Sequence, residues 1–367
     1  MKRIAIKEVC EVYDGPHATP KKTDNGPVYL GIDAITEDGM LDPSQFAHLS
    51  EEDYVKWTKR VTPQENDIVF SYEATLGRYA VIPKNFYGCL GRRLAIVRII
   101  NDELNAKWLY YYFRSPEWTS FIKNQTVKGS TVDRISIEEF PEYTIPVISL
   151  EDQNKIVDVL DKIDRKIADN KKINDYLEQQ ALLIFRYMFK NISNGSNHVG
   201  DYITPKRGKA LLSKDAIPGQ FPVIAGGLLP ATYHNRANTV APVLTISGSG
   251  ANAGYVNIWH DPIWSSDSSF IDYEMTTNVY FWYAFLKFRQ QDIFDIQTGS
   301  AQPHIYPKHI AELSIGNIDR FQIASYITQV TPLFTKAGAN IRETKRLQQL
   351  RDWLLPMLMN GQVTIED

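Results

Sequence analysis

The chain has 367 residues and a formal net charge of −3, and 43% of its residues are hydrophobic. This length is enough for two domains with separate cores, and the composition excludes an intrinsically disordered protein. No segment approaches the roughly 20 consecutive apolar residues of a membrane-spanning helix, and no apolar leader follows the N-terminus. We therefore expect a soluble cytoplasmic protein in which Cys10 and Cys89 are reduced, buried thiols.

Residues 1–149 are predicted to form a mixed α+β domain. Apolar runs of strand length at 27–32, 67–71 and 94–100 are separated by glycine, proline and asparagine or aspartate turn signals. The aromatic run at 108–113 has the character of a helix. We interpret it as core, because aromatic runs at helical spacing more often fill a core than stack on bases.

Residues 150–190 are predicted to form one long helix, because apolar positions recur at alternating steps of four and three. Two asparagines interrupt this heptad seam at its middle. Charged residues of both signs fill the other faces, as expected of a solvated helix. The seam consists of Ile156, Leu160, Ile163, Ile167, Asn170, Asn174, Leu177, Ala181, Ile184 and Met188.

Residues 191–318 resemble the first domain, with strand-like runs at 222–225, 242–247 and 268–271 and an aromatic run at 278–286. Residues 319–367 are predicted to form a second long helix with a weaker seam. Pro332 and Pro356 are expected to start, kink or end this helix near their positions.

A repeat relates the two halves of the chain. Gly129-Ser130, Ile135 and Asn170 each recur at one constant offset, as Gly299-Ser300, Ile305 and Asn340. An offset that spans nearly half of the chain indicates two copies of a whole domain-plus-helix module. The match is best over the loop and helix, and the preceding domains need insertions to align.

The two helices can bury their seams against each other. An intramolecular antiparallel pair would bring Asn170 and Asn174 near Asn340 and Thr344, where buried polar residues would fix the register. The alternative is that each helix packs only on its own domain, although about 60 Å of helix exceeds the width of a small domain. We therefore expect an α+β protein with two similar domains, separated and followed by helices that pair as an antiparallel coiled coil, with pseudo-two-fold symmetry.

The order and duplication of these motifs resemble the specificity (S) subunits of type I restriction-modification systems. The resemblance covers essentially the whole chain. It implies target-recognition domains at 1–149 and 191–318 and spacer helices at 150–190 and 319–367, which are the central and C-terminal conserved regions of such subunits. The segments that carry it are 127–136, 143–147, 150–156, 174–180, 298–305 and 346–351.

This resemblance implies a DNA-binding subunit without catalytic activity. Each target-recognition domain would read one half of a bipartite double-stranded DNA sequence, and the helices would fix the gap between the halves. Two methyltransferase subunits, which use S-adenosylmethionine, and ATP-driven restriction subunits would be partners, whereas this chain itself would bind no cofactor or metal. Independently, a rigid spacer of this length suits two modules that contact grooves about 34 Å apart.

Basic and polar residues near glycine-rich turns are the candidates for DNA contact. An isolated basic pair is more often solvated surface, whereas the two glycine-serine loops rank higher because they occur in both copies. His304, beside the second of these loops, is the histidine of most interest. The candidates are Lys21, Lys22, Arg92, Arg93, Lys128, Gly129, Ser130, Thr131, Arg134, Lys206, Arg207, Lys209, Arg236, Ser249, Asn252, Gly299, Ser300, Gln302 and His304.

The sequence lacks the motifs of an enzyme that acts on DNA. It has no glycine-rich cofactor loop, no Asn/Asp-Pro-Pro-aromatic motif for a flipped base and no phosphate-binding P-loop. These absences disfavour a methyltransferase fused to its own specificity domain. The remaining rival is a scaffold without DNA affinity that joins two copies of a partner protein through the coiled coil.

Overall fold

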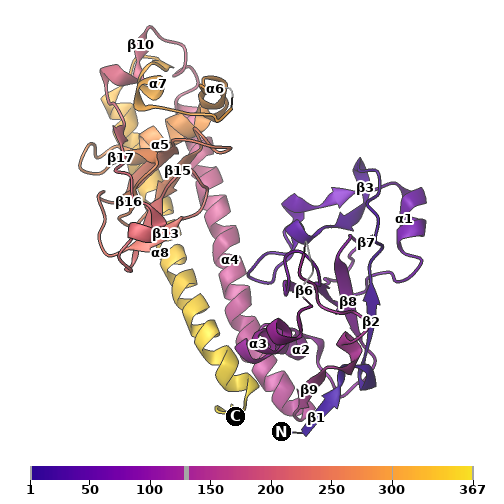
Figure 1. Ribbon diagram of the computed structural model, residues 1–367. Coiled ribbons are helices and arrows are strands. Elements are labelled where there is room, and N and C mark those ends of the chain that lie inside the picture. Colours follow the sequence, from indigo (N-terminus) through magenta and orange to yellow (C-terminus); the bar gives the residue numbers. More distant parts are fainter. Residues whose placement is uncertain (1, 128–131, 300, 366–367) are drawn as a thin grey trace. The chain divides into compact units, whose positions relative to one another are not determined.

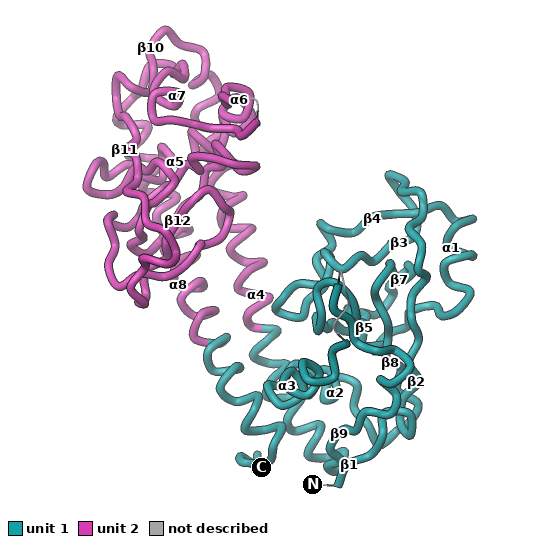
Figure 2. Tube along the Cα trace, viewed as in Figure 1, with its two compact units in different colours: residues 1–165, 347–367 teal, residues 166–346 magenta. Residues whose placement is uncertain are grey.

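The computed structural model describes residues 2–127, 132–299 and 301–365. The chain forms two compact units (Figure 2). The first comprises residues 1–165 and 347–367, and the second comprises residues 166–346. Each unit contains a mixed α/β domain and segments of two long helices, so the fold class expected from the sequence is confirmed.

The two long helices are α4 (Leu150–Met188) and α8 (Arg320–Met359), of 39 and 40 residues. Ser149 caps α4: its hydroxyl oxygen accepts from the Asp152 N–H at 3.1 Å and also donates to the Asp152 carboxylate. Pro332 and Pro356 neither start nor end α8, which continues through both positions. Each proline removes one backbone hydrogen bond, and buried neighbours such as Val330 and Leu358 hold the helix in place.

The domain of the first unit is built on three sheets (Figure 1). Their strand orders are β2-β8-β5-β6, β4-β3-β7 and β1-β9, and only the β3–β7 pairing is parallel. The strands are β1 (Lys2–Ala5), β2 (Cys10–Asp14), β3 (Thr23–Leu30), β4 (Ala47–His48), β5 (Ile68–Ser71), β6 (Tyr79–Val81), β7 (Gly88–Leu90), β8 (Leu94–Ile99) and β9 (Thr144–Val147). The helices before α4 are α1 (Glu51–Trp57), α2 (Ala106–Phe113) and α3 (Pro116–Gln125).

The domain of the second unit repeats this topology. Its sheets have the orders β11-β17-β14-β15, β13-β12-β16 and β10-β18, and again one inner pairing, β12–β16, is parallel. The strands are β10 (Asn197–His198), β11 (Lys206–Arg207), β12 (Phe221–Ile224), β13 (Thr232–His234), β14 (Val243–Ser247), β15 (Val256–Trp259), β16 (Trp264–Ser265), β17 (Ser268–Asp272) and β18 (Ser314–Ile315). The helices between α4 and α8 are α5 (Val279–Phe288), α6 (Gln290–Asp295) and α7 (Pro307–Ala311).

Equivalent elements lie at an offset that shrinks along the chain. The first short 3-10 turn starts at Ile6 and its counterpart starts at Val199. The long helices start at Leu150 and Arg320, which lie closer together in sequence than the two turns do. The second domain is therefore the shorter copy. The sequence repeat appeared only near the helices because that is where the offset becomes constant.

Aromatic helices form the centre of both domain cores. Every residue of α2 from Trp108 to Phe113 is buried, as are Phe281 to Leu286 of α5. The prediction that these runs are core is confirmed. Cys10 and Cys89 are free and buried, and burial raises the pKa of both thiols to about 12. The helices of the described chain include none long and apolar enough to span a membrane.

The ends of the long helices belong to these cores. In the first unit, Leu160 of α4 and Leu358 of α8 pack in the cluster that contains α2. In the second unit, Phe185 of α4 and Tyr326 of α8 pack in the cluster that contains α5. The helices therefore both pair with each other and pack on a domain, so the two interpretations of the seam are each right in part.

The buried face of α4 shifts near its C-terminal end. The heptad pattern assigns Ile184 and Met188 to the seam, but Phe185 and Phe189 are the buried residues and the other two are only half-buried. An α-helix has 3.6 residues per turn and drifts away from a 3.5-residue repeat. The large phenylalanine rings follow that drift into the aromatic core.

Candidate nucleic-acid interface

The two long helices are antiparallel where they meet in the second unit. The Gln322 side-chain amide donates to the Met188 carbonyl at 2.6 Å, and the Asn174 amide donates to the Ala337 carbonyl at 3.2 Å. Residue numbers that rise along α8 thus fall along α4. The same direction holds in the first unit, where Arg351 pairs with Asp164 at 2.9 Å.

The four polar seam residues are brought together at the middle of this pair. The Asn340 amide donates to Asn174 Oδ1 at 2.8 Å, and the Asn170 amide faces the Asn340 carbonyl at 3.5 Å and Thr344 Oγ1 at 3.4 Å. Asn170 also donates to the Glu343 carboxylate at 2.8 Å, which lowers the pKa of Glu343. Asn170 and Asn340 are each only 1% exposed.

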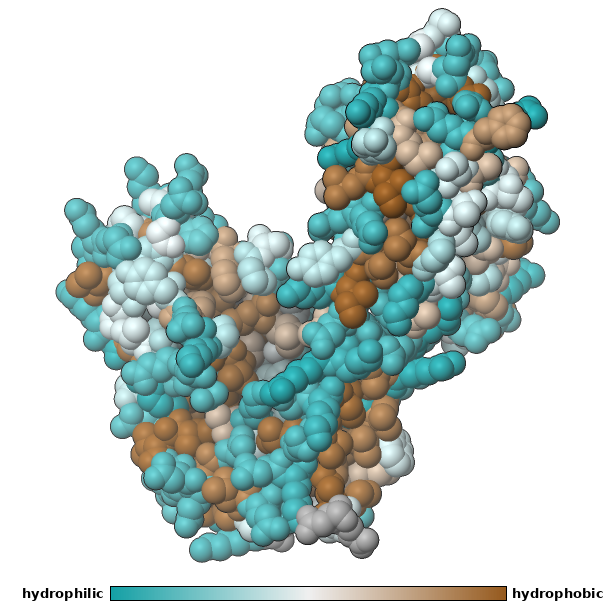
Figure 3. Space-filling view, turned by 180° about the vertical axis from the view of Figure 1, so that it is seen from behind, coloured by the Kyte–Doolittle hydropathy of each residue, from teal (hydrophilic) through white to brown (hydrophobic). Residues whose placement is uncertain are grey.

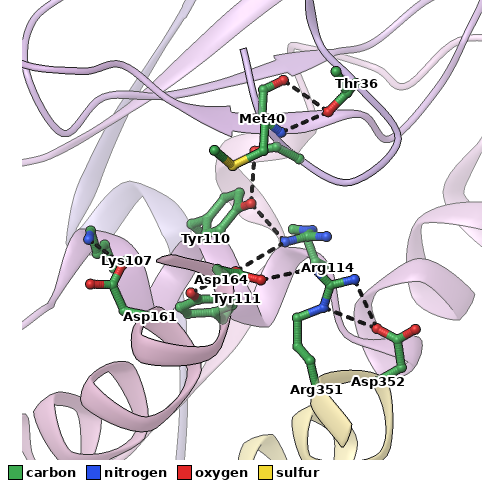
Figure 4. A network of polar contacts seen from close by, with 11 residues as sticks. Thr36, Met40, Lys107, Tyr110, Tyr111, Arg114, Asp161, Asp164, Arg351 and Asp352 are labelled. Carbon is green, nitrogen blue, oxygen red and sulfur yellow. Dashed lines mark hydrogen bonds and ion pairs between the residues drawn. The ribbon is translucent and has the colours of Figure 1, made fainter. Parts of the chain in front are cut away.

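A polar network attaches the first domain to both helices (Figure 4). The Asp164 carboxylate of α4 accepts from the Tyr111 hydroxyl at 2.9 Å and pairs with the buried Arg351 guanidinium of α8. Arg114 donates to the Tyr110 hydroxyl at 2.7 Å, and that hydroxyl donates to the Gly39 carbonyl at 2.9 Å. The network links a loop of the domain, through α2, to the helix pair.

In the first domain, the ends of three strands meet a hairpin. The Gly15 N–H donates to the Leu94 carbonyl at 2.8 Å, and the Tyr72 N–H donates to the Arg93 carbonyl at 3.1 Å. The Ile135 N–H in turn donates to the Tyr72 carbonyl at 2.8 Å. We call this meeting point, residues 14–15, 72–73, 92–94 and 134–135, the first junction.

The same hydrogen bonds recur in the second domain. The Gly208 N–H donates to the Ser268 carbonyl at 2.8 Å, and the Gly248 N–H donates to the Asp267 carbonyl at 3.0 Å. The Ile305 N–H then donates to the Gly248 carbonyl at 3.0 Å. We call residues 207–208, 248–249, 266–268 and 304–305 the second junction. Position by position, the two junctions are equivalent.

The side chains of the first junction are mostly charged. The Arg93 guanidinium pairs with the Glu73 carboxylate, with 3.0 Å between Nε and Oε1. Asp14 pairs with Arg60 at 2.7 Å and with His17 at 3.0 Å. These groups surround the Tyr72 hydroxyl, which is buried and has no hydrogen-bond partner among the described residues. Burial, with Asp14 and Glu73 nearby, raises the pKa of Tyr72.

The second junction carries different side chains at the same positions. Arg207 stands where Asp14 stands, Ser249 where Glu73 stands, and Asp267 where Arg93 stands. The Asp267 carboxylate accepts from Arg207 and, through its other oxygen, from the Ser249 hydroxyl. The position of Tyr72 is taken by Gly248, where an added Cβ would lie 2.3 Å from Arg207 Nη1. The backbone frame is thus kept while the chemistry is changed.

The hairpins beside the junctions contain the two glycine-serine loops. The Val127 N–H donates to the Arg134 carbonyl at 2.9 Å, and the Thr298 N–H donates to the His304 carbonyl at 3.0 Å. Gly299 has a φ of +96°, and an added Cβ would meet the Gln302 carbonyl at 2.4 Å, so glycine is required there. The remaining loop candidates lie outside the described residues: Lys128, Gly129, Ser130, Thr131 and Ser300.

The structure brings only part of the predicted DNA-contact set to the junctions. Arg92, Arg93 and Arg134 belong to the first junction, and Arg207, Ser249 and His304 belong to the second. The exposed Lys206 and Lys209 flank Arg207, and Asn252 and Gln302 lie in the adjoining turns.

Three candidates are not tied to the junctions. No hydrogen bond or ion pair between described residues joins Lys21, Lys22 or Arg236 to either junction. Lys21 and Lys22 are exposed immediately before β3, and the Arg236 guanidinium lies 5.6 Å from the centre of the Trp264 ring.

Sequence reasoning missed the acidic residues of the junctions. Asp14, Glu73 and Asp267 were not candidates, because basic residues and glycines were the features sought. Strand pairing brings these acids to the arginines from distant positions, so no local motif marks them. An alignment that let the repeat offset shrink along the chain would have placed the two junctions opposite each other. In the parts of the chain that the structure describes, no cluster of His, Cys, Asp or Glu is suited to a metal ion.

Comparisons with known proteins identify this architecture. Residues 1–179 match the family described as the type I restriction modification DNA specificity domain. They are a domain of that family. The first junction lies within this specificity domain, and the family resemblance seen in the sequence is thereby confirmed.

Two characterised relatives extend the similarity. The specificity subunit of the type I restriction enzyme MjaIX from Methanocaldococcus jannaschii is 23% identical over 361 residues, which covers 87% of this chain and 82% of the relative. A putative type I restriction enzyme specificity subunit from Haemophilus influenzae is 28% identical over 123 residues, covering 32% of this chain and 29% of the relative. The first of these carries the likeness beyond the specificity domain and along most of the chain.

A solved structure shares the fold. The S subunit of a type I restriction-modification system from M. genitalium aligns with a TM-score of 0.57 and 19% identity, covering 97% of this chain and 95% of the other. The arrangement of two α/β domains and two long helices is therefore common to this chain and that structure.

Proposed function

We propose that this chain is the DNA-recognition subunit of a type I restriction-modification complex and is itself not catalytic. Each α/β domain reads one half of a bipartite double-stranded DNA sequence. The observation that carries the proposal is the pair of junctions, which share their backbone hydrogen bonds but differ in their polar and charged side chains. Base reading depends on such side chains, so one frame with two sets of them suits two different half-sites.

In this proposal, residues 1–149 and 191–318 are the target-recognition domains, and residues 150–190 and 319–367 are the spacer. The antiparallel contacts of α4 with α8 support a stiff spacer. Buried polar residues at the seam, Asn170 and Asn340 above all, support a fixed register, because a slipped pair would leave their amides without partners. A fixed register would set the gap between the two half-sites.

The partners proposed are two methyltransferase subunits, which carry S-adenosylmethionine, and ATP-dependent restriction subunits. Support comes from apolar side chains that α4 and α8 leave in solvent. Leu183, Tyr187 and Phe321 are 63%, 75% and 87% exposed. The molecular surface displays such hydrophobic residues in patches broken by hydrophilic ones (Figure 3). Apolar residues exposed together on a surface mark sites of association.

The test is methylation by the assembled complex. The chain is co-expressed with the methyltransferase subunit of its own source, and methylated bases are mapped in the host genome. A bipartite motif with a constant gap is expected. DNA binding by the purified complex should also weaken steeply as salt rises, because phosphate contacts release counterions.

Two outcomes would refute the proposal. Sequence-independent binding with a flat salt dependence would favour a scaffold without DNA affinity. Methylation by this chain alone would show that it is an enzyme.

The spacer is tested separately by removing one heptad from each long helix at facing positions. The expected result is a shorter permitted gap with both half-sites unchanged. The matched control removes the heptad from α4 alone, which disrupts the facing register and should abolish methylation. A complex that keeps the original gap after the double deletion would refute the ruler role of the helices.

A further inference from the structure

Each junction holds one arginine against a carboxylate, but the arginine comes from opposite positions. In the second junction Arg207, at the end of β11, pairs with Asp267 before β17. In the first junction the residue before β8 is Arg93, which pairs with Glu73, and the end of β2 carries Asp14 instead. A charged site has therefore been retained in both copies while the signs of its members were exchanged.

The second junction holds Arg207 in a defined place. Its side chain lies against Gly248, where even a methyl group would come within 2.3 Å of Nη1 and 2.8 Å of Asp267 Oδ1. Asp267 is itself fixed by the Ser249 hydroxyl. The Arg207 side chain remains 39% exposed, and among the described residues Asp267 is the only group that its guanidinium is seen to bond.

The first junction holds Arg93 by different means. Its backbone has a φ of +71°, which is a left-handed conformation that a long side chain rarely adopts. Such strain persists where the surrounding structure enforces it, often at functional sites. The Arg93 side chain is 31% exposed and its carboxylate partner Glu73 is 27% exposed. Asp14 is already neutralised by Arg60 and His17.

We propose that Arg207 and Arg93 are the guanine-reading residues of the second and first domains, respectively. A guanidinium donates in a planar fork that matches the O6 and N7 acceptors of guanine in the major groove. A carboxylate that holds one edge of this fork fixes its plane and leaves the other edge for a base. This inference rests on the proposed function, and it names the base and the residue that reads it.

The adjacent carboxylate argues against a phosphate contact. Asp267 would lie within a few ångströms of any phosphate bound to Arg207, and two negative charges at that distance repel. A guanine edge carries no net charge and presents only acceptors to the arginine. The pairing that would weaken a phosphate contact therefore leaves base reading unaffected.

The experiment selects DNA from a duplex library randomised in both half-sites, using the complete methyltransferase complex and each variant in turn. The variants are R207A, R207K and R93A. The matched control is R342A, because Arg342 forms an exposed pair with Asp261 at 3.0 Å in the same unit but outside the junction.

The unchanged complex should require a guanine at one position of each half-site. R207A should lose that preference by roughly 10- to 100-fold at one base pair of the second half-site and leave the first intact. R93A should do the reverse, and R342A should match the unchanged complex. The half-site that remains intact shows that the variant is folded and assembled.

R207K separates base reading from phosphate contact. Lysine keeps the charge but lacks the planar fork, so the preference should fall as it does in R207A. Retention of the preference in R207A, or its retention in R207K with loss of a phosphate in the salt dependence, would overturn the inference. Neither result would affect the proposed function, which fails only if the unchanged complex selects no bipartite sequence.

Discussion

The two units differ most in how each domain is joined to the long helices. In the first unit the joint is ionic, since Asp164 of α4 and Arg351 of α8 pair beneath Tyr111. In the second unit it is mainly aromatic: Tyr280 of α5 stacks on Phe334 of α8 with ring centres 4.4 Å apart. The topology of the domains is the same, so the difference shows that one backbone frame accepts either kind of joint.

The junctions teach the same lesson on a smaller scale. Their backbone hydrogen bonds are duplicated, whereas the side chains at three equivalent positions are exchanged. A main-chain hydrogen bond does not depend on residue type, so it tolerates substitution of the side chains that project from it. Surface chemistry can then diverge without loss of the fold.

The largest expected effect is on the ionic joint. Arg351→Ala leaves Asp164, which is 15% exposed, without its close partner, and should lower the free energy of unfolding by about 3 kcal/mol. The measurement is urea unfolding. The control is Asp352→Asn: this carboxylate also contacts Arg351 but is 67% exposed, so we expect less than about 0.5 kcal/mol. Equal effects of the two variants would show that burial does not decide the strength of this joint.

The second effect concerns the amide pair of the second unit. Asn340→Ala removes the donor to Asn174 Oδ1 and should cost about 1–3 kcal/mol in unfolding experiments. Replacing both Asn170 and Asn340 by leucine should restore much of that stability, because no amide is then left buried alone. If the double variant is less stable than the single one, the amides are better partners than apolar side chains here.

A third effect distinguishes the units by pH. Burial among Tyr280 and Phe334 lowers the pKa of His260 from 6.5 to about 4, with Asp261 opposing and Arg342 adding to the shift. The unfolded state therefore takes up this proton first, so stability is lost as the pH falls from about 6.5 to about 4. The slope from this group is at most about 1.4 kcal/mol per pH unit.

The pH effect is measured as the difference between the protein and His260→Phe over that range. Phenylalanine keeps the aromatic contacts and does not titrate, so the variant should lose less stability in acid. Parallel stability curves for the two proteins would contradict the assignment.

The smallest effect on stability is expected at Gly248. In Gly248→Ala the new methyl group meets only the ends of the Arg207 and Asp267 side chains, which can move, so unfolding should change by about 0.5 kcal/mol. Selection of the second half-site should nevertheless weaken, because Arg207 is displaced. The control is Gly227→Ala, where the nearest atom, the Leu229 carbonyl oxygen, is 3.6 Å away. A selective effect of Gly227→Ala instead would break the link between Gly248 and reading.

Periodicity made the helices and cores predictable from the sequence. The seam and the constant repeat offset placed Asn170 opposite Asn340, and the structure has the two side chains in that region together. The aromatic runs were assigned to the cores for the same reason. Spacing along one helix is local information, and it survives folding unchanged.

The acidic halves of the junctions could not be read in this way. Glu73 follows β5 and Arg93 precedes β8, just as Arg207 ends β11 and Asp267 precedes β17, so each pair forms only through strand pairing. Likewise the shift from Ile184 to Phe185 depends on the aromatic core that α4 meets. Both features belong to tertiary structure, which a pattern along the chain does not encode locally.

The first unit is discontinuous in sequence, since its core requires Leu355, Leu358 and Met359 from the last turns of α8. The second unit, residues 166–346, is one unbroken segment. During synthesis from the N-terminus, the second unit therefore becomes complete while the first still lacks a wall. A ribosome stalled after residue 346 should hold a protease-resistant second unit and a sensitive first one. The domain translated first is the last to mature, because it waits for the end of α8 to be made.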